Sequence, residues 1–426
     1  MRSRATAWGC LGFGALSLAC AVPCLAAGAW LTESGGADTA MAGAGRSALS
    51  LDAASQVANP AALALLPRST VTAAAMPLVL DTGFRGSAAT PGTAGDRSGL
   101  QSLGGLYGAH VDGGLVYGLS AYSYFGLGFE LGDQWVGRRA MDRAALVTFN
   151  VAPAVGFRVS DRLSVGASVA AQWAHYDYAL AAASDAAWFG PPAGLPDGRV
   201  EIEGSSWEPG GQLGLLYSAS EQLRVGLDWT APVHHSFGTN LDTQDLHPVL
   251  EGLLPAESDV ELRATVPQQL AFGLAHGTRE GRVVSFGLTW QDWSAMGDAT
   301  VRLPGMVSDV FPGGLRDTWG ASLGFRQPVG HDWVLSAGLA YESDPALTEG
   351  VPVYFPVTEQ WRIAAGAERR ISEDCRLRVA LSVMDEGSVK LMPMSPPLPL
   401  PGIPQLTGSY TGSRVALLAV AVDYDL

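Results

Sequence analysis

The sequence predicts an all-β fold: a fourteen-stranded antiparallel transmembrane β-barrel plugged by a small N-terminal hatch with short helices. Between residues 69 and 426, short polar turns alternate with long irregular connections, and an alternating apolar segment lies on each side of every connection. Six short turns and seven long connections make thirteen connections, and therefore fourteen strands. Short turns at one end and long loops at the other are typical of an outer-membrane barrel.

The composition supports the same fold. The chain has 426 residues, of which 47% are hydrophobic and 16% are charged. Past residue 30 no continuous apolar run reaches the roughly 20 residues that a membrane-spanning helix needs. The apolar residues recur instead at every second position, which is the period of a strand. Because a backbone in lipid must satisfy its own hydrogen bonds, a closed barrel is the remaining spanning structure.

Residues 1–27 have the pattern of a secretory signal peptide. Arg2 and Arg4 precede an apolar stretch at residues 5–25, which ends in small residues suited to a cleavage site. We therefore expect export across the inner membrane and residence in the outer membrane of a Gram-negative cell.

The cysteine content bears on disulfide bonding, and the net charge limits the classes of binding partner. Three of the four cysteines lie in the predicted signal peptide, so Cys375 remains alone and forms no internal disulfide. A lipoprotein signal ending at Cys20 is the alternative, but Ser17 stands where an aliphatic residue is expected. The formal net charge of -15 argues against nucleic acid as a partner and suits loops that face the outside.

Individual strands show two distinct faces. In residues 332–343 one alternating face is apolar and suits lipid, whereas the other is small or polar and suits a lumen. Residues 223–230 and 376–384 alternate in the same way. The final strand, residues 415–426, suits recognition by the barrel assembly machinery, although it ends in Leu426 rather than in an aromatic residue.

Several tryptophans lie toward strand ends. Trp and Tyr favour the depth where a membrane meets water, because one edge of the ring can be hydrated there. Contact with a ligand is the alternative role for such residues. We expect the following to form interfacial girdles: Trp229, Trp290, Trp293, Trp333 and Trp361.

The segment between the signal peptide and the first strand, residues 28–68, is too long for a simple tether. It is rich in small residues, and Pro60 interrupts two short helical turns at residues 54–57 and 61–66. We expect a compact hatch inside the barrel formed by residues 69–426. A disordered periplasmic leader is the alternative, which the apolar content of the segment disfavours.

The hatch segment carries a specific resemblance. The stretch GAGRSALSLDAASQVANPAAL, with the motif Asn59, Pro60 and Ala61, resembles the hatch of the FadL family of outer-membrane transporters of long-chain fatty acids and other hydrophobic compounds. Further segments are similar to strands of this family, in order and at the right spacing: residues 123–138, 206–229, 266–294, 339–345 and 358–366. The chain is therefore identified as a member of this family.

The resemblance implies passive uptake of a hydrophobic molecule. In this family the ligand is captured by apolar extracellular loops, moves to a pocket in the plugged barrel and leaves through a gap in the wall at a kinked third strand. The corresponding residues here are Ser123, Gly126 and Gly128. Interior glycines in strands often mark bulges or bends, which agrees with a kink at this place.

The expected capture surface consists of two loops that are unusually apolar for exposed segments, residues 183–195 and 246–254. Exposed apolar patches commonly mark binding sites, and these loops would present Trp188, Phe189 and Leu250 to a ligand. The alternative is that the two loops pack on each other as a cap.

The nature of the ligand stays open. Fatty-acid transporters of the family place basic residues beside the pocket, and these positions fall here on His175 and near Arg302. His175 shares a strand face with Leu163 and Trp173, which favours an outward, interfacial histidine. Long-chain fatty acids and aromatic or other neutral hydrocarbons are therefore both candidate ligands.

No motif for catalytic, metal or cofactor chemistry stands out, so we expect no enzyme activity, no metal and no cofactor. An outer-membrane lipid hydrolase would need a Ser/His pair, for which Ser236 and Ser285 are the open candidates. A general polar porin would lack both the hatch and the apolar loops. The expected partners are a hydrophobic small molecule, outer-membrane lipid with lipopolysaccharide, and the barrel assembly machinery.

Overall fold

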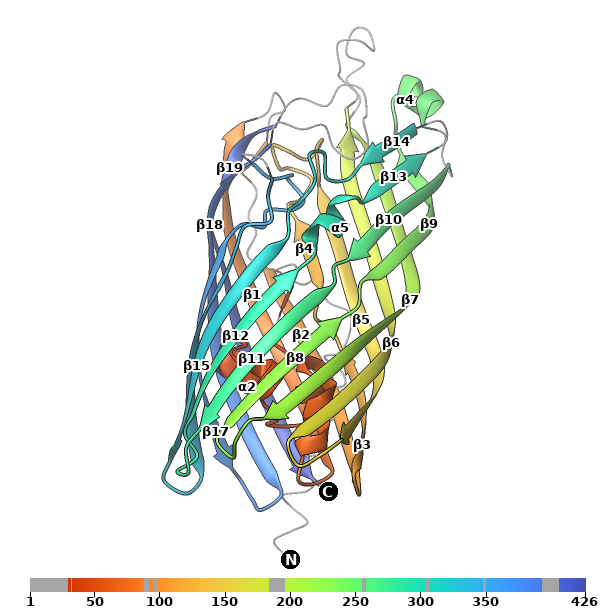
Figure 1. The fold of residues 1–426 in the computed structure, drawn as a ribbon. Helices are drawn as coiled ribbons and strands as arrows, with labels where there is room; N and C mark the ends of the chain where they lie inside the picture. The colour runs from red at the N-terminus through yellow and green to blue at the C-terminus, as the bar shows by residue number, and fades with distance from the viewer. Residues whose placement is uncertain are drawn as a thin grey trace, which may run out of the picture.

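The computed structural model is a closed antiparallel β-barrel with the N-terminal segment inside its lower half (Figure 1). It describes residues 30–31, 33–87, 92–94, 99–183, 196–254, 258–303, 306–347, 350–392 and 406–426. The barrel closes because the first strand pairs with the last, from Thr70 opposite Asp425 to Ser87 opposite Thr407.

In the described part of the chain, nineteen strand segments make up fourteen spans. Nine spans are single strands: β1 (Thr70–Ser87), β2 (Gly99–Asp112), β5 (Arg143–Arg158), β6 (Leu163–Ala182), β7 (Gly198–Ser218), β16 (Trp333–Glu342), β17 (Gln360–Arg370), β18 (Cys375–Lys390) and β19 (Thr407–Asp425). Five spans are interrupted: β3 (Leu115–Tyr122) with β4 (Gly126–Glu130), β8 (Leu223–Thr230) with β9 (Val233–Gln244), β10 (Asp259–Val266) with β11 (Gln269–Gly277), β12 (Val283–Gln291) with β13 (Thr300–Leu303), and β14 (Met306–Asp309) with β15 (Thr318–Val329). The predicted fold class of fourteen antiparallel strands is confirmed.

The two ends of the barrel differ as predicted. The short turns gather at the end that also holds the C-terminus, and the long connections gather at the opposite end (Figure 1). Side chains alternate between the faces: Leu335 and Leu339 are exposed on the outer surface, whereas Ser336 between them is buried. In the described part of the chain, no helix has the length and apolar content needed to cross a membrane.

The aromatic girdle prediction holds only in part. Trp229, Trp333 and Trp361 are exposed on the outer surface, and Trp290 is partly exposed. Trp293 is only 1% exposed and lies inside the barrel, which corrects its assignment to a girdle. Trp290 and Trp293 are three positions apart and therefore cannot share one face of an alternating strand; Trp293 has the parity of the buried Gln291.

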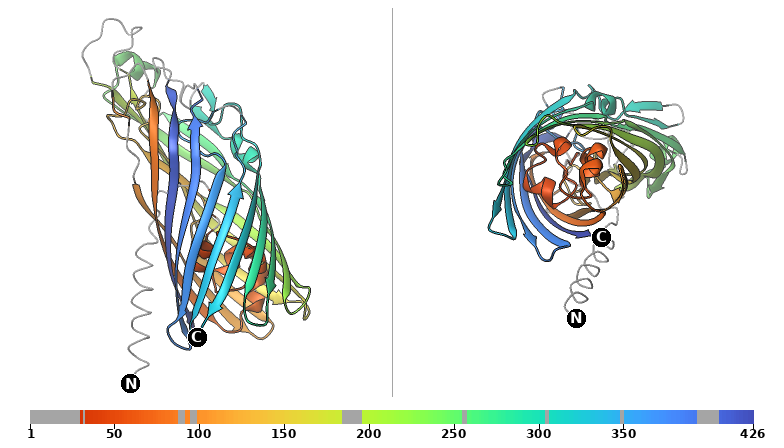
Figure 2. Two further views of the ribbon diagram at one scale, coloured as in Figure 1. Left: turned by 90° about the vertical axis from the view of Figure 1, so that its left-hand side faces the viewer. Right: turned by 60° about the horizontal axis from the view of Figure 1, so that its bottom comes forward.

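The described part of the N-terminal segment forms four short helices that lie within the ring of strands: α2 (Gly36–Ala40), η1 (Arg46–Ala48), α3 (Ser55–Ala58) and η2 (Pro60–Leu65) (Figure 2). Wall glycines permit this close packing. A Cβ atom at Gly214 would lie 1.9 Å from Asn59 Oδ1, and one at Gly338 would lie 2.1 Å from the Met41 backbone. We call residues 33–66 the hatch.

The hatch is tied to the wall by polar contacts. Asn59 Nδ2 donates to the carbonyls of Ser47 (2.7 Å) and Leu215 (2.9 Å), and its Oδ1 accepts from the amide of Ala61 (2.9 Å), which caps η2. The side chains of Asp52 and Arg378 form an ion pair of 2.8 Å and are only 4% and 3% exposed. The hatch is therefore held by groups that have lost nearly all contact with water.

Candidate functional site

The third span of the barrel is broken between β3 and β4. β3 pairs with β2 as far as Tyr122 opposite Gly105, and β4 pairs with β5. Among the described residues, no hydrogen-bonded ladder joins β4 to residues 99–104 of β2. One side-chain bond crosses this place, from Gln101 Nε2 to the carbonyl of Gly128 at 3.5 Å. We call this place the wall break.

The chain turns inward at the wall break. Ser123 lies in the interruption, and Gly126 is the first residue of β4, so the break falls at the predicted kink residues. Phe125 is buried and forms an isolated bridge with Trp30, while the amide of Leu31 donates to the carbonyl of Tyr124 at 2.9 Å. The beginning of the described N-terminal segment therefore pairs with the inturned residues.

An apolar cavity lies beside the wall break. Its wall comes from β5, β6 and β10, from helix α5 (Trp293–Gly297) and from two inward segments of the long connections. Its larger lining residues are Phe125, Tyr176, Tyr178, Met296, Phe311 and Phe355, and none of its lining side chains is charged.

Tyrosine hydroxyls do not make this cavity polar. Tyr178 donates its hydroxyl to the carbonyl of Ala140 at 2.5 Å, and Tyr354 donates to the carbonyl of Val310. Because both hydroxyls are satisfied by the backbone, the rings of Tyr178 and Tyr354 present mainly carbon to the cavity. The cavity is suited to a ligand without charge.

Aromatic contacts connect the cover of the cavity to the wall break. The rings of Phe311 and Phe355 meet edge to face with centroids 5.1 Å apart, and Phe355 contacts Trp293 at 5.7 Å. Trp293 in turn lies 6.0 Å from Phe125, which forms part of the break. A ligand in the cavity therefore touches the inturned residues of the third span.

Local hydrogen bonds fix the residues around Trp293. Asp292 Oδ1 accepts from the amide of Ala295 at 3.3 Å, as expected of a residue that caps a helix N-terminus. Trp293 Nε1 donates to Gln291 Oε1 at 2.8 Å. The sequence WQDWS therefore ends a strand, begins a helical turn and satisfies a buried indole.

Below the cavity the lumen becomes polar. Paired positions on neighbouring strands carry hydrogen-bonding side chains, for example Asn150 opposite Gln172 and Gln269 opposite Gln291. We call this set the polar belt: Asn150, Gln172, Gln212, Thr230, Gln269, Gln291, Thr318, Glu342 and Gln360. On the spans that also line the cavity, the belt residues stand closer than the cavity residues to the short-turn end, as Asn150 does on β5 and Gln172 does on β6.

The residues predicted to bind the ligand are placed apart. Leu250 is buried in α4 (Pro248–Leu253), whereas Trp188 and Phe189 lie outside the described residues. His175 faces outward: its ring stacks on Trp173 with centroids 5.6 Å apart, and its Nδ1 lies 3.0 Å from Ser205 Oγ.

Arg302 is exposed on β13 opposite Glu261. Neither His175 nor Arg302 lines the apolar cavity. The alternation of β6 explains the position of His175, because it shares the outer face with Trp173 while Tyr176 and Tyr178 take the inner face.

Sequence reasoning missed the residues that build the cavity. The pattern YDY at residues 176–178 places two aromatic rings on the lumen face, and this alternation was readable in the sequence. Phe311 and Phe355 come from long connections, where no period predicts a direction. In the described part of the chain, no group of three or more His, Cys, Asp or Glu side chains is arranged to hold a metal ion.

Known proteins resemble this chain along most of its length. Residues 17–426 match the profile of the family described as "Outer membrane protein transport protein (OMPP1/FadL/TodX)". The long-chain fatty acid transport protein of Escherichia coli O6:H1 is 22% identical over 412 residues, which cover 88% of this chain and 91% of that protein. The corresponding protein of Salmonella typhi is 21% identical over 404 residues, with 88% and 92% covered.

Solved structures show the same fold. A FadL homologue from Pseudomonas aeruginosa superposes with a TM-score of 0.83 at 18% identity, covering 93% of this chain and 100% of that chain. The toluene transporter TodX from Pseudomonas putida gives a TM-score of 0.69 at 18% identity, with the same coverage. The family profile matches residues 17–426, and the chain has a plugged barrel with a broken third span. The protein therefore belongs to the FadL/TodX family of outer-membrane transporters of hydrophobic compounds.

Proposed function

We propose that the protein takes up neutral hydrophobic molecules by passive movement from the apolar cavity through the wall break into the membrane. The observation that carries this proposal is the uncharged lining of the cavity together with its contact, through Phe125, with the break. A charged ligand would lose its hydration in this cavity without gaining a partner, which is costly. A neutral one would gain from the same transfer.

The energetics favour spontaneous entry. Apolar surface gains about 25 cal/mol per Å² on leaving water, so burying about 200 Å² of a small hydrocarbon supplies about 5 kcal/mol. This gain requires no energy source, and it allows the ligand to leave again. Passive uptake is therefore sufficient for the proposed route.

The polar belt favours exit to the side. A hydrocarbon that moved downward would separate hydrogen-bonded groups such as Gln172 and Asn150, whose amide and carbonyl atoms lie 2.9 Å apart. Leaving buried polar groups unsatisfied costs about 1–3 kcal/mol each. The wall break avoids this cost because it opens at the level of Tyr122 to Gly126, next to the cavity.

The second candidate ligand is a long-chain fatty acid. The names of the relatives from Escherichia coli and Salmonella typhi support it. The cavity lining opposes it, because no cation stands there to pair with a carboxylate. Capture by the outer loops, with Leu250 of α4 and the predicted Trp188 and Phe189, serves either ligand.

Filling the cavity tests the proposal. Ala144 is buried, lines the cavity and stands opposite Tyr178 on the lumen face, so Ala144→Trp should lower the affinity for naphthalene by about tenfold or more and should reduce uptake. Ala171→Trp is the matched control, because Ala171 is exposed on the outer face of β6. Equal binding and uptake by wild type and both variants would show that this cavity is not the ligand site.

A further inference from the structure

Three tyrosines line the apolar cavity, and one of them differs from the other two. The hydroxyls of Tyr178 and Tyr354 donate to backbone carbonyls. The hydroxyl of Tyr176 makes no hydrogen bond to any described residue. The other described lining residues have no hydroxyl, amide or charged side chain. Among the residues that the structure describes, the Tyr176 hydroxyl is therefore a single unpartnered polar group in a lining of carbon.

Packing holds the Tyr176 ring in the lumen. Its side chain leaves the inner face of β6 and is only 9% exposed. On one side its ring lies parallel to that of Tyr178, with centroids 6.5 Å apart and an angle of 4° between the planes. On another side it contacts Phe237, with centroids 6.2 Å apart. The position of the hydroxyl is thus set by two aromatic neighbours rather than by a hydrogen bond.

Tyr176 stands at the height of the wall break. Leu146 on β5 is opposite Tyr176 on β6 and opposite Leu127 on β4. Leu127 is the second residue of β4, where the third span resumes. Tyr178 stands two residues nearer the long loops, where the connection at residues 131–142 supplies a carbonyl to its hydroxyl. A ligand that moves from the cavity to the wall break therefore passes the unpartnered hydroxyl of Tyr176.

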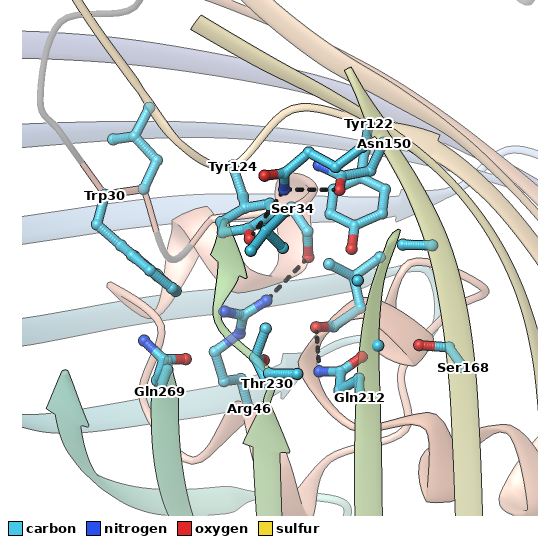
Figure 3. A pocket seen from close by; sticks show the side chains of 18 of the residues that line it. Trp30, Ser34, Arg46, Tyr122, Tyr124, Asn150, Ser168, Gln212, Thr230 and Gln269 are labelled. Carbon is cyan, nitrogen blue, oxygen red and sulfur yellow. Dashed lines mark hydrogen bonds between the residues drawn. The ribbon is translucent and has the colours of Figure 1, made fainter. Parts of the chain in front are cut away.

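The pocket below the apolar cavity, between the hatch and the wall, has a different chemistry (Figure 3). The hydroxyl of its Tyr124 accepts from Gln172 Nε2 at 3.1 Å. Arg46 and Glu33 also line this pocket, so it carries charges of both signs. A neutral ligand group that needs one hydrogen bond finds it at Tyr176 without the desolvation of a charged side chain.

The unpartnered hydroxyl distinguishes ligands by what each of them offers it. A hydrocarbon packed against the hydroxyl removes its access to water and supplies no acceptor, which is unfavourable. A ligand with a neutral oxygen at this place accepts the hydrogen bond and avoids that loss. A carboxylate would accept the bond too, but one hydroxyl without a cation does not offset the loss of its hydration.

We propose that Tyr176 determines the ligand specificity of the apolar cavity, with its hydroxyl donating a hydrogen bond to a neutral oxygen of the ligand. Hydrophobic molecules that carry one ether, ketone or hydroxyl oxygen are then favoured over plain hydrocarbons. This inference rests on the proposed uptake of neutral hydrophobic molecules through the cavity. It narrows the substrate class to neutral oxygenated aromatic or aliphatic compounds.

Two probes of nearly equal shape test the proposal on the full-length purified protein. 2-Methoxynaphthalene has an oxygen where 2-ethylnaphthalene has a methylene group, and binding is followed by the fluorescence of the shared ring system. We define the oxygen preference as the ratio of their affinities divided by the ratio of their partition coefficients from water into cyclohexane. One hydrogen bond should give wild type an oxygen preference of about fivefold.

Tyr176→Phe removes only the hydroxyl and should abolish the oxygen preference, while 2-ethylnaphthalene binds as tightly as to wild type. Tyr178→Phe is the matched control, because the Tyr178 hydroxyl already has a backbone partner. It should change the affinities of both probes alike and keep the preference. Tyr217→Phe, on the outer face of β7 at 45% exposure, should change neither affinity. An oxygen preference retained in Tyr176→Phe, or an equal loss for both probes there, would overturn the proposal.

Wild type alone also tests the proposal if a variant does not assemble. The absence of an oxygen preference would show that the hydroxyl does not select the ligand. Tighter binding of 2-naphthoate than of 2-methoxynaphthalene would show that the cavity selects anions. Either result overturns the proposal. Failure of the proposed function differs, because naphthalene binding would then be insensitive to Ala144→Trp.

Discussion

The upper and lower halves of the lumen are built from opposite kinds of side chain. The upper cavity is lined by carbon and directs its tyrosine hydroxyls to backbone carbonyls, as Tyr178 does toward Ala140. The lower half holds the polar belt and a hatch fixed by buried ion pairs such as Asp52 with Arg378. An apolar molecule is stabilised in the first region and destabilised in the second. This contrast gives the proposed route its direction without any energy source.

The largest expected effect comes from breaking the lower region. Arg378 contacts Asp52 at 2.8 Å, so Arg378→Met leaves this buried carboxylate without its cation, whereas Glu368 keeps Arg326 at 3.0 Å. Removing one member of a buried pair costs about 3–5 kcal/mol. We expect this loss in the free energy of unfolding, measured in urea by the gel mobility of folded and unfolded protein.

The matched control for that variant is Arg414→Met. Arg414 pairs with Asp385 at 3.2 Å, but the two side chains are 65% and 49% exposed. An exposed pair contributes at most about 1 kcal/mol. A similar loss from both variants would contradict the view that buried ion pairs hold the hatch.

A smaller effect is expected from loosening the hatch alone. Asn59→Ala removes the bonds to the carbonyls of Ser47 and Leu215 and the cap on η2, together about 2–3 kcal/mol. Hydrogen exchange of the hatch should become faster and uptake should fall, while the barrel stays heat-modifiable. Asn240→Ala, on an exposed position of β9, should change neither. Loss of the whole barrel in Asn59→Ala would instead show that the barrel needs the hatch in order to fold.

The barrel was predictable because its signals are local and repeated. The turn at residues 330–332 and the alternation of Leu335 with Ser336 follow from neighbouring residues and the period of a strand. The position of the wall break was also suggested by Gly126. Each of these features depends on a few consecutive residues.

The cavity could not be predicted in the same way. Phe311 and Phe355 come from connections without a period, and they meet only because the loops fold inward. Trp293 was assigned to a girdle by residue type alone, although it has the parity of the lumen-facing Gln291 and not that of the outward Trp290. The assignment of His175 by resemblance placed a ligand group on the outer face, which the alternation of the strand already opposed.

The smallest expected effect lies at the outer rim, above both regions. Asp197 binds Arg138 at 3.0 Å and Arg139 at 2.7 Å. Burial acts to raise the pKa of Asp197, but the hydrogen bond and charge of Arg139, with Arg138, outweigh burial and leave this pKa below its ordinary value. A carboxyl group whose pKa is lower in the folded protein stabilises the fold at pH values above its ordinary pKa. This stabilisation is lost as the pH falls through the lowered pKa.

The contacts of Asp197 should therefore persist at neutral pH and weaken below about pH 4. Limited proteolysis of the loop at residues 131–142 should become faster at that pH in wild type. Asp197→Asn should show the faster cleavage already at neutral pH, with a stability loss of about 1 kcal/mol and little change in ligand binding. Cleavage that does not depend on pH in wild type would contradict this assignment.

The wall break is tested most directly by closing it. Gly126→Trp places a large ring where the third span resumes. Gly238→Trp is the control, because it places the same ring at an exposed position of β9, where no atom lies within 4 Å of an added Cβ. Naphthalene binding and uptake are then measured together. The proposed lateral exit predicts near-normal binding by both variants, uptake below about a tenth of wild type for Gly126→Trp, and normal uptake for Gly238→Trp. Normal uptake by Gly126→Trp would contradict the lateral route and favour a path through the hatch.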